Sequence, residues 1–189
     1  DRRVFWRSVL RGRRGFHLAP DAYAPDADPR RIDGASFVGL FLSRRAVALA
    51  GMPDAGLFLY GDDTLYTLQL SARGGRLVFV PSLRFEHDCR SLGAGRHLSP
   101  IWRLYYYHRN LLLVYRAVAG AFFWPALFVI VPKWLWSAAR HPEGGGRALR
   151  LMARALRDGV AQRTSIPHER VRLWASLNRS EGCRGDSAP

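Results

Sequence analysis

The sequence predicts an α/β fold followed by a mostly helical tail. Between residues 34 and 87, apolar runs of strand length alternate with segments of helical composition. Beyond residue 98 the apolar spacing is helical and basic residues accumulate. The chain of 189 residues is long enough for one domain with a sizeable core and an appended element. We therefore expect an α/β unit over 1–97 and a helical, basic unit at a membrane interface over 98–163.

The strong positive charge predicts an anionic partner. The formal net charge is +14, and Lys133 is the only lysine among the 29 basic residues. Nucleic acid, acidic lipid headgroups and sugar diphosphates all fit this charge, so it names only a class of partner. The apolar fraction of 48% excludes a globally disordered chain.

Two features concern the chain as a whole. Cys89 and Cys183 lie far apart without metal-ligand spacing, so we expect reduced, cytosolic thiols. The chain opens with Asp1 and has no apolar signal core near its start, so we expect it to begin within a longer protein.

The first unit is expected to contain strands and helices in a defined order. Residues 1–31 are rich in proline, arginine and aspartate and predict a turn-rich loop. A strand over 34–43 and a helix ending at Gly51 follow, and then a helix over 64–75. Two short strands, 76–80 and 83–87, are separated by Pro81.

The second unit begins with a long apolar helix over 99–120. The uncharged window 117–132 has 16 residues, fewer than the roughly 20 that a spanning helix needs, and contains Pro125. Tryptophans flank it and cations follow it, which is typical of a helix at headgroup depth. We expect interfacial membrane binding, with a buried helix and a true span as the alternatives. The nearby aromatic and cationic residues are Trp124, Lys133, Trp134, Trp136 and Arg140.

The last part of the chain divides into a helix and a polar end. Residues 144–163 place Leu149, Met152 and Leu156 about one helical turn apart with arginines between them, which predicts a basic amphipathic helix. From residue 164 to 189 the chain is polar, and we expect it to be disordered.

The segment Tyr60-Gly61-Asp62-Asp63-Thr64 offers the clearest chemistry. It joins an apolar stretch to a helix, and two acids at a helix start have a structural explanation as a cap and a dipole partner. A carboxylate held there beside a cleft can also take a proton from a hydroxyl group, as glycosyl transfer with inversion requires. Both interpretations stay open on the residues alone.

Residues 36–88, SFVGLFLSRRAVALAGMPDAGLFLYGDDTLYTLQLSARGGRLVFVPSLRFEHD, resemble the second half of the GT-A catalytic domain in family 2 glycosyltransferases of the rhamnosyl- and galactofuranosyl-transferase type. The shared order is a strand and helix, an acidic pair, a helix, a Val-Pro strand end and a final strand finishing in histidine. The resemblance implies an inverting transferase that moves a sugar from a nucleotide-sugar donor to a lipid-linked or cell-envelope glycan. It also implies a peripheral protein on the cytoplasmic face of the membrane.

The resemblance assigns three catalytic and metal roles. It makes Asp63 the general base, Asp62 its neighbour at the acceptor, and His87 a ligand of a divalent metal, Mn²⁺ or Mg²⁺. The family's Asp-x-Asp metal motif lies in the nucleotide-binding half. Asp26-Ala27-Asp28 matches the Asp-x-Asp pattern, but it lies in a proline-flanked loop. No alternating strand-helix units that could bind a nucleotide precede Phe37. The donor-binding half is therefore expected to be missing, and the metal is expected only with it.

Five further residues are expected to bind substrate. Arg109 and Arg116 are seven apart on one helix face and can meet a diphosphate or a lipid headgroup, although aromatic packing on the first unit is an equal alternative. The expected acceptor contacts carry over more loosely from the family. The substrate-binding set is Trp6, Asp33, Gly34, Tyr60 and Arg109.

Two other functions compete with the transferase. A non-catalytic arginine-rich module would bind a membrane surface or nucleic acid, but no known nucleic-acid reader motif is evident, so nucleic acid is not expected as a partner. A membrane scaffold is the third possibility, in which the Asp62-Asp63 pair is only a helix cap.

Overall fold

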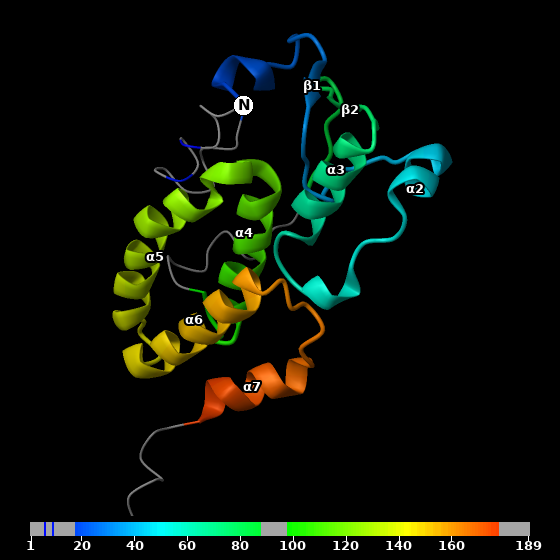
Figure 1. Cartoon of the computed structure of the whole chain (residues 1–189). Coiled ribbons are helices and arrows are strands. Elements are labelled where there is room, and N and C mark those ends of the chain that lie inside the picture. The colour runs from blue at the N-terminus through cyan, green and yellow to red at the C-terminus, as the bar shows by residue number, and fades with distance from the viewer. Residues whose placement is uncertain (1–5, 7–8, 10–17, 88–97, 178–189) are drawn as a thin grey trace, which may run out of the picture.

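The computed structural model describes Trp6, Val9, residues 18–87 and residues 98–177. These residues form two groups that lie side by side in Figure 1, a small mixed unit over 18–87 and a helical unit over 98–177. Helix α4 of the helical unit lies between the mixed unit and the remaining helices. The described residues are mostly helical, with one two-stranded sheet. The GT-A fold expected from the sequence thus stays a proposal.

The mixed unit contains one short sheet and several short helices. Strands β1 and β2 pair antiparallel, with Arg31 opposite Val78. Helix α3 packs beside α2 over a small core of Ala50, Tyr66, Leu70 and Leu77. In chain order the elements are η2 (Pro20–Tyr23), β1 (Arg30–Ile32), α2 (Arg44–Ala50), η3 (Ala55–Leu57), α3 (Asp62–Ala72) and β2 (Leu77–Phe79).

Local signals determine the ends of α2 and α3. The Ser43 hydroxyl accepts a hydrogen bond from the Ala46 amide at 3.1 Å, which caps α2, and Gly51 ends it with φ 79°. Helix α3 follows Gly61 (φ 76°) and stops just before Gly74 (φ 87°). Both helices confirm the expectation from the sequence.

Strand expectations in this unit are met only at β2. Residues 34–43 are irregular and turn at Gly39 (φ 72°), and the described chain over 83–87 contains no strand. Strand β1 instead comes from a segment expected to be a loop. A strand needs a hydrogen-bonded neighbour, and among the described residues β1 and β2 pair only with each other.

The helical unit is organised around α4. Helices α4 and α6 make the most extensive contact in the structure, through a core that includes Tyr105, Leu151, Met152 and Ala155. Helices α4 and α6 confirm the expected helices. The elements are α4 (Arg103–Ala119), η5 (Gly120–Phe122), α5 (Phe123–Ala139), α6 (Gly145–Val160) and α7 (His168–Ser176).

The apolar stretch Arg103–Ala139 is long and apolar enough to cross a membrane by length and composition, but it consists of two packed helices. The chain breaks at Gly120 (φ 53°), and the Tyr115 ring stacks on Trp134 with centroids 6.3 Å apart. The break is therefore not at Pro125, which lies in the first turn of α5, where its missing N–H has no intrahelical acceptor. The proline in the helix interior is Pro132.

Helix α7 differs from the disorder expected beyond residue 164. Val171 is fully buried and Ala175 nearly so, one turn apart against α6. The Trp174 ring lies between two guanidinium groups, Arg154 at 4.9 Å and Arg170 at 5.5 Å. At its first residue, His168 Nδ1 also lies 3.1 Å from the Tyr106 hydroxyl, so both ends of α7 are held against the protein. Residues 178–189, including Cys183, lie outside the described residues, as does Cys89.

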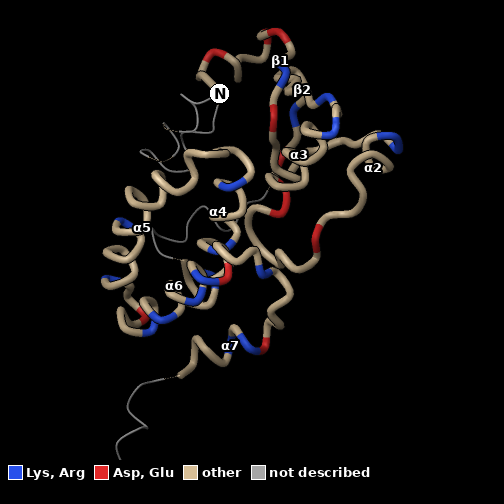
Figure 2. Tube along the Cα trace, in the orientation of Figure 1, with Lys and Arg blue, Asp and Glu red and all other residues tan. Residues whose placement is uncertain are grey.

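The positive charge is concentrated in the helical unit (Figure 2). Residues 18–87 carry eight acids and seven cations, whereas residues 98–177 carry three acids and twelve cations. The mixed unit is thus close to neutral, and any polyanion should meet the helical unit first.

Candidate functional site

The acidic pair opens helix α3. Asp62 is its first residue, Asp63 its second, and both are half-buried. The Asp63 Oδ1 atom accepts hydrogen bonds from the Thr64 amide at 2.6 Å and the Thr64 hydroxyl at 3.2 Å. The free amides at this end of the helix are donors that can bind carboxylate oxygens. The two side chains therefore have the ordinary environment of acids at a helix start, beside the loop that precedes them.

The loop leading into the pair is strained. Phe58 has φ 61° and ψ −52°, and the Leu59 amide donates to the Leu57 carbonyl at 2.7 Å, which makes a γ-turn of the rare positive-φ type. Tyr60 also has a positive φ of 67°. Each such non-glycine residue costs on the order of 1–3 kcal/mol and persists only where its surroundings hold it.

Two buried side chains of α4 hold this loop, and we call Arg109 and Asn110 the carbonyl clamp. Both are fully buried. Arg109 Nη2 donates to the carbonyls of Gly56 at 2.8 Å and Leu57 at 3.1 Å, and Arg109 Nε donates to Asn110 Oδ1 at 2.7 Å. The Asn110 side-chain amide lies within hydrogen-bond distance of the carbonyls of Leu57 (2.9 Å), Leu59 (2.9 Å) and Tyr60 (2.7 Å). The clamp thereby offsets the strain of the loop.

The charge of Arg109 is balanced inside the protein. Its guanidinium lies 5.4 Å from the Tyr105 ring and 5.1 Å from the Tyr106 ring. The Tyr105 hydroxyl donates to the buried Asp158 carboxylate at 2.9 Å. Burial, and then the bond to Asp158, raise the pKa of Tyr105, while Arg109 opposes that rise. The clamp is thus connected to an anion on α6.

The segment after β1 is bonded to the side of α3. The Thr67 hydroxyl, fully buried, accepts from the Ala35 amide at 2.9 Å, and the Ser71 hydroxyl donates to the Asp33 carbonyl at 2.8 Å. A Cβ on Gly34 would lie 3.5 Å from the Thr67 hydroxyl oxygen. The structure therefore places Gly34 beside the middle of α3 and Asp33 beside Ser71, near the C-terminal end of that helix.

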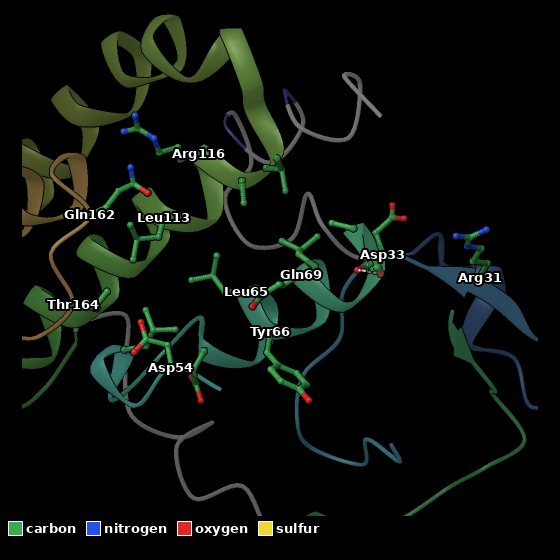
Figure 3. Close-up of a pocket in the computed structure, with 17 residues that line it drawn as sticks. Arg31, Asp33, Asp54, Leu65, Tyr66, Gln69, Leu113, Arg116, Gln162 and Thr164 are labelled. Atoms are coloured by element: carbon green, nitrogen blue, oxygen red, sulfur yellow. Dashed lines mark hydrogen bonds between the residues drawn. The ribbon is translucent and has the colours of Figure 1, made fainter. Parts of the chain in front are cut away.

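A cleft of about 840 Å³ lies between α3 and α4 (Figure 3). Its volume is within the range of small-molecule sites, roughly 300–1,000 Å³. Asp62 lines the cleft, whereas Asp63 is not among the lining residues. The other charged residues of its wall are Arg31, Asp33, Asp54 and Arg116.

The structure separates the two arginines that the sequence places on one helix face. Arg109 is buried under the loop, where its donors bond to carbonyls, so in this arrangement it has no access to a ligand. Arg116 is exposed and lines the cleft, with its guanidinium 5.2 Å from the Phe123 ring. Helical spacing places both arginines on one face of α4. The loop over residues 56–61 buries Arg109 and leaves Arg116 exposed, and this difference does not follow from the spacing.

Three other expected site residues lie apart from the cleft wall. The half-buried Tyr60 packs edge-on against Tyr107 at 5.6 Å. Trp6 packs against Phe122 at 6.1 Å, in the cluster between α4 and α5. His87 is exposed and outside any helix or strand.

The described residues contain no group of three or more His, Cys, Asp or Glu side chains that could hold a metal ion. His87 is thus without partner ligands in the described part of the chain. The resemblance places the remaining ligands in a nucleotide-binding half, and the described residues by themselves do not form a metal site.

Sequence reasoning missed the loop-holding role of Asn110 and the strain at Phe58. The Arg109-Asn110 doublet was a usable signal, because an adjacent guanidinium and amide inside an apolar helix must find acceptors. The positive φ at Phe58 has no signal in the sequence, since phenylalanine rarely adopts it.

Comparison with known proteins returns no relative. No protein-family model, no curated protein and no solved structure matches this chain.

Proposed function

We propose that this chain is the acceptor-side half of an inverting family 2 glycosyltransferase in which Asp63 is the general base. The observation that carries the proposal is the acidic pair at the start of α3, beside a cleft and after a strained loop held by the carbonyl clamp. Strain of this kind accumulates where a side chain must be aimed for function. An ordinary helix cap needs neither the strain nor the two buried residues that offset it.

In the proposed reaction, the Asp63 carboxylate takes the proton of an acceptor hydroxyl group. The hydroxyl oxygen then attacks the anomeric carbon of the donor sugar, and the bond from that carbon to the nucleoside diphosphate breaks. The leaving group departs with the bonding electrons, and attack from the opposite face inverts the anomeric centre. The Asp63 Oδ1 atom accepts from Thr64, so Oδ2 is the oxygen that would take the proton.

The cleft supplies the remaining contacts in this proposal. Asp62 accepts hydrogen bonds from acceptor hydroxyls, because it lines the cleft directly. Arg31 and Arg116 face the same cleft and meet phosphate oxygens of a lipid-linked acceptor or of the donor. Arg116 thus takes the ligand-binding role that the sequence assigned to Arg109.

The donor and the metal belong to the nucleotide-binding half in this proposal. The resemblance implies Mn²⁺ or Mg²⁺ with His87 as one ligand, and the metal would neutralise charge on the leaving diphosphate. No step assigned to the described residues depends on it. A polyprenyl-linked or cell-envelope glycan acceptor would place the protein peripherally on the cytoplasmic face of the membrane.

The second candidate function is a non-catalytic basic module. It is favoured by the concentration of cations in the helical unit, twelve against three acids over 98–177. This function predicts that Asp62 and Asp63 can be exchanged without consequence. It also predicts retention on any polyanion that falls steeply with salt.

The test uses the polypeptide translated from the complete reading frame, with nucleotide-sugar and isoprenoid-linked acceptors. Asp63→Asn should abolish sugar transfer and leave the dissociation constant for the nucleotide sugar within about twofold, because the carboxylate meets the acceptor. Asp26→Asn is the matched control. It removes the same charge from an exposed loop and should leave transfer unchanged. Turnover preserved in Asp63→Asn would refute the base assignment.

A further inference from the structure

Helix α5 exposes a continuous apolar face, which we call the α5 face. Its residues recur every four positions along α5, counted from Trp124, with some of their direct neighbours. They therefore share one side of the helix. Phe128 is 84% exposed, Trp136 63% and Trp124 54%. Large apolar side chains this exposed and this contiguous mark an interaction surface. The members of the α5 face are Trp124, Pro125, Phe128, Val129, Pro132 and Trp136.

The opposite side of α5 is already occupied by protein. Phe123, Ala126 and Ile130 are buried against α4 residues including Leu112 and Tyr115. Helix α5 has 17 residues, at the short limit of the roughly 17–25 that span a bilayer. With one side packed on α4, the α5 face can meet only one surface, along the length of the helix.

Helix α6 is not a second such surface. The sequence predicted a basic amphipathic helix here, within a unit expected at a membrane interface, but Leu151, Met152 and Ala155 are buried against α4 and its neighbours. Two of its arginines are turned toward α7, with Arg150 donating to the Leu177 carbonyl and Arg154 over the Trp174 ring. Helix α6 therefore presents no comparable apolar face, and α5 is the candidate membrane surface.

The charges around the α5 face indicate what covers it. Residues 98–142 contain no aspartate or glutamate. Lys133 is exposed within the turn that carries Pro132 and Trp136, and the Arg140 guanidinium lies 3.9 Å from the centroid of the Trp136 ring. Tryptophan rings with adjacent cations are enriched where acyl chains meet charged headgroups. An apolar face bordered by cations and free of acids favours an anionic lipid surface as its partner.

We propose that the α5 face docks α5 in the plane of an anionic membrane surface, with its rings at headgroup depth. A helix of 17 residues is about 25 Å long, so it offers one long contact to the lipid. The inference deepens the proposed function by naming the surface through which the protein meets the membrane. The inference rests on the proposed function, because a membrane-bound acceptor is what would require this surface. Its test does not depend on that function, because the test measures only lipid binding.

The test is sedimentation of the full chain with vesicles of equal parts phosphatidylcholine and phosphatidylglycerol, and with phosphatidylcholine alone. Wild type should pellet with the anionic vesicles and much less with the neutral ones. Phe128→Asp should weaken the anionic partition at least about tenfold, because a phenyl group is lost from lipid and a repelled charge is added. Phe41→Asp is the matched control, since Phe41 is 88% exposed on the mixed unit and takes the same charge change. It should bind as wild type does.

Three results would overturn the proposal. These are Phe128→Asp binding like wild type, equal binding of wild type to both vesicles, and equal loss in Phe41→Asp. A fourth would identify a second copy as the occupant, namely self-association of wild type in size-exclusion chromatography that Phe128→Asp abolishes without any vesicle binding by wild type. Transfer to a soluble acceptor should be unchanged in Phe128→Asp, so this inference can fail while the proposed reaction stands.

Discussion

The side-chain amide of Asn110 lies 2.7 Å from the Tyr60 carbonyl oxygen, which it reaches across 50 positions of the sequence. This bond joins α4 to Tyr60, two residues before the start of α3 at Asp62. Together with the bonds to Leu57 and Leu59, it connects the position of the acidic pair to the core of the helical unit. The stability of the clamp can therefore be measured separately from the function of the acids.

Replacing Asn110 by alanine should lower the free energy of unfolding by about 2–4 kcal/mol, because it leaves buried carbonyls without donors. Urea unfolding followed by circular dichroism measures the change. Ser137→Ala, on the exposed side of α5, is the control and should stay within about 0.5 kcal/mol of wild type. An Asn110 effect as small as the control would mean that the clamp does not hold the loop.

Replacing Arg109 by lysine keeps the charge but should still lower the free energy of unfolding by about 2 kcal/mol or more, since an ammonium cannot reproduce the guanidinium fork. The fork bonds to Gly56, Leu57 and, through Nη1, to Thr164 at 3.2 Å. Amide hydrogen exchange over residues 57–61 should accelerate more than exchange in α6. Unaltered exchange in this loop would contradict the proposed restraint.

The contact between α4 and α6 depends on the missing side chain of Gly159. A Cβ there would lie 2.7 Å from Leu112 Cδ1 and 2.9 Å from the Arg109 carbonyl oxygen. Gly159→Ala should therefore cost about 1–3 kcal/mol of unfolding free energy. Gly146→Ala in the same helix meets nothing closer than 3.8 Å and should raise stability by about 0.5 kcal/mol. Equal effects of the two changes would refute the close packing.

His108 should make stability depend on pH. Burial lowers its pKa to about 4, while its bond to the Leu104 carbonyl opposes that shift. An unfolded histidine has a pKa near 6.5, so between those values the unfolded chain binds more protons and stability falls as pH falls. Unfolding free energies at pH 7 and pH 5 should show a loss of about 2 kcal/mol from this residue. His108→Gln should show a correspondingly flatter slope, and an identical slope would exclude His108 as the cause.

Helices α2, α3 and α6 could be predicted from the sequence because their signals are local, whereas α7 lies where disorder was expected. Ser43 and Gly51 bound α2, Gly74 follows α3, and the apolar spacing of α6 covers its whole length. The strands could not, since a strand depends on a partner elsewhere in the chain. Residues 34–43 have the composition of a strand but no neighbour among the described residues, while residues 30–32 pair with β2.

The candidate site was predictable in part. The position of Asp62 and Asp63 at a helix start agrees with the sequence. The acceptor contacts expected of Asp33 and Gly34 stay predictions. The burial of Arg109 does not follow from helical spacing, because it results from the loop over 56–61 folding across one end of the face that Arg109 shares with Arg116. The burial of the apolar side of α6 could not be predicted either, because an amphipathic pattern is the same whether that side packs on a protein core or on a membrane.

The most direct measurement of the central claim is the anomeric configuration of the transferred sugar. The polypeptide of the complete reading frame would be supplied with an α-linked nucleotide sugar and an isoprenoid-linked acceptor, and the product examined by nuclear magnetic resonance. We expect a β-linked product from wild type and none from Asp63→Asn. An α-linked product, or the same product from Asp63→Asn, would contradict the account.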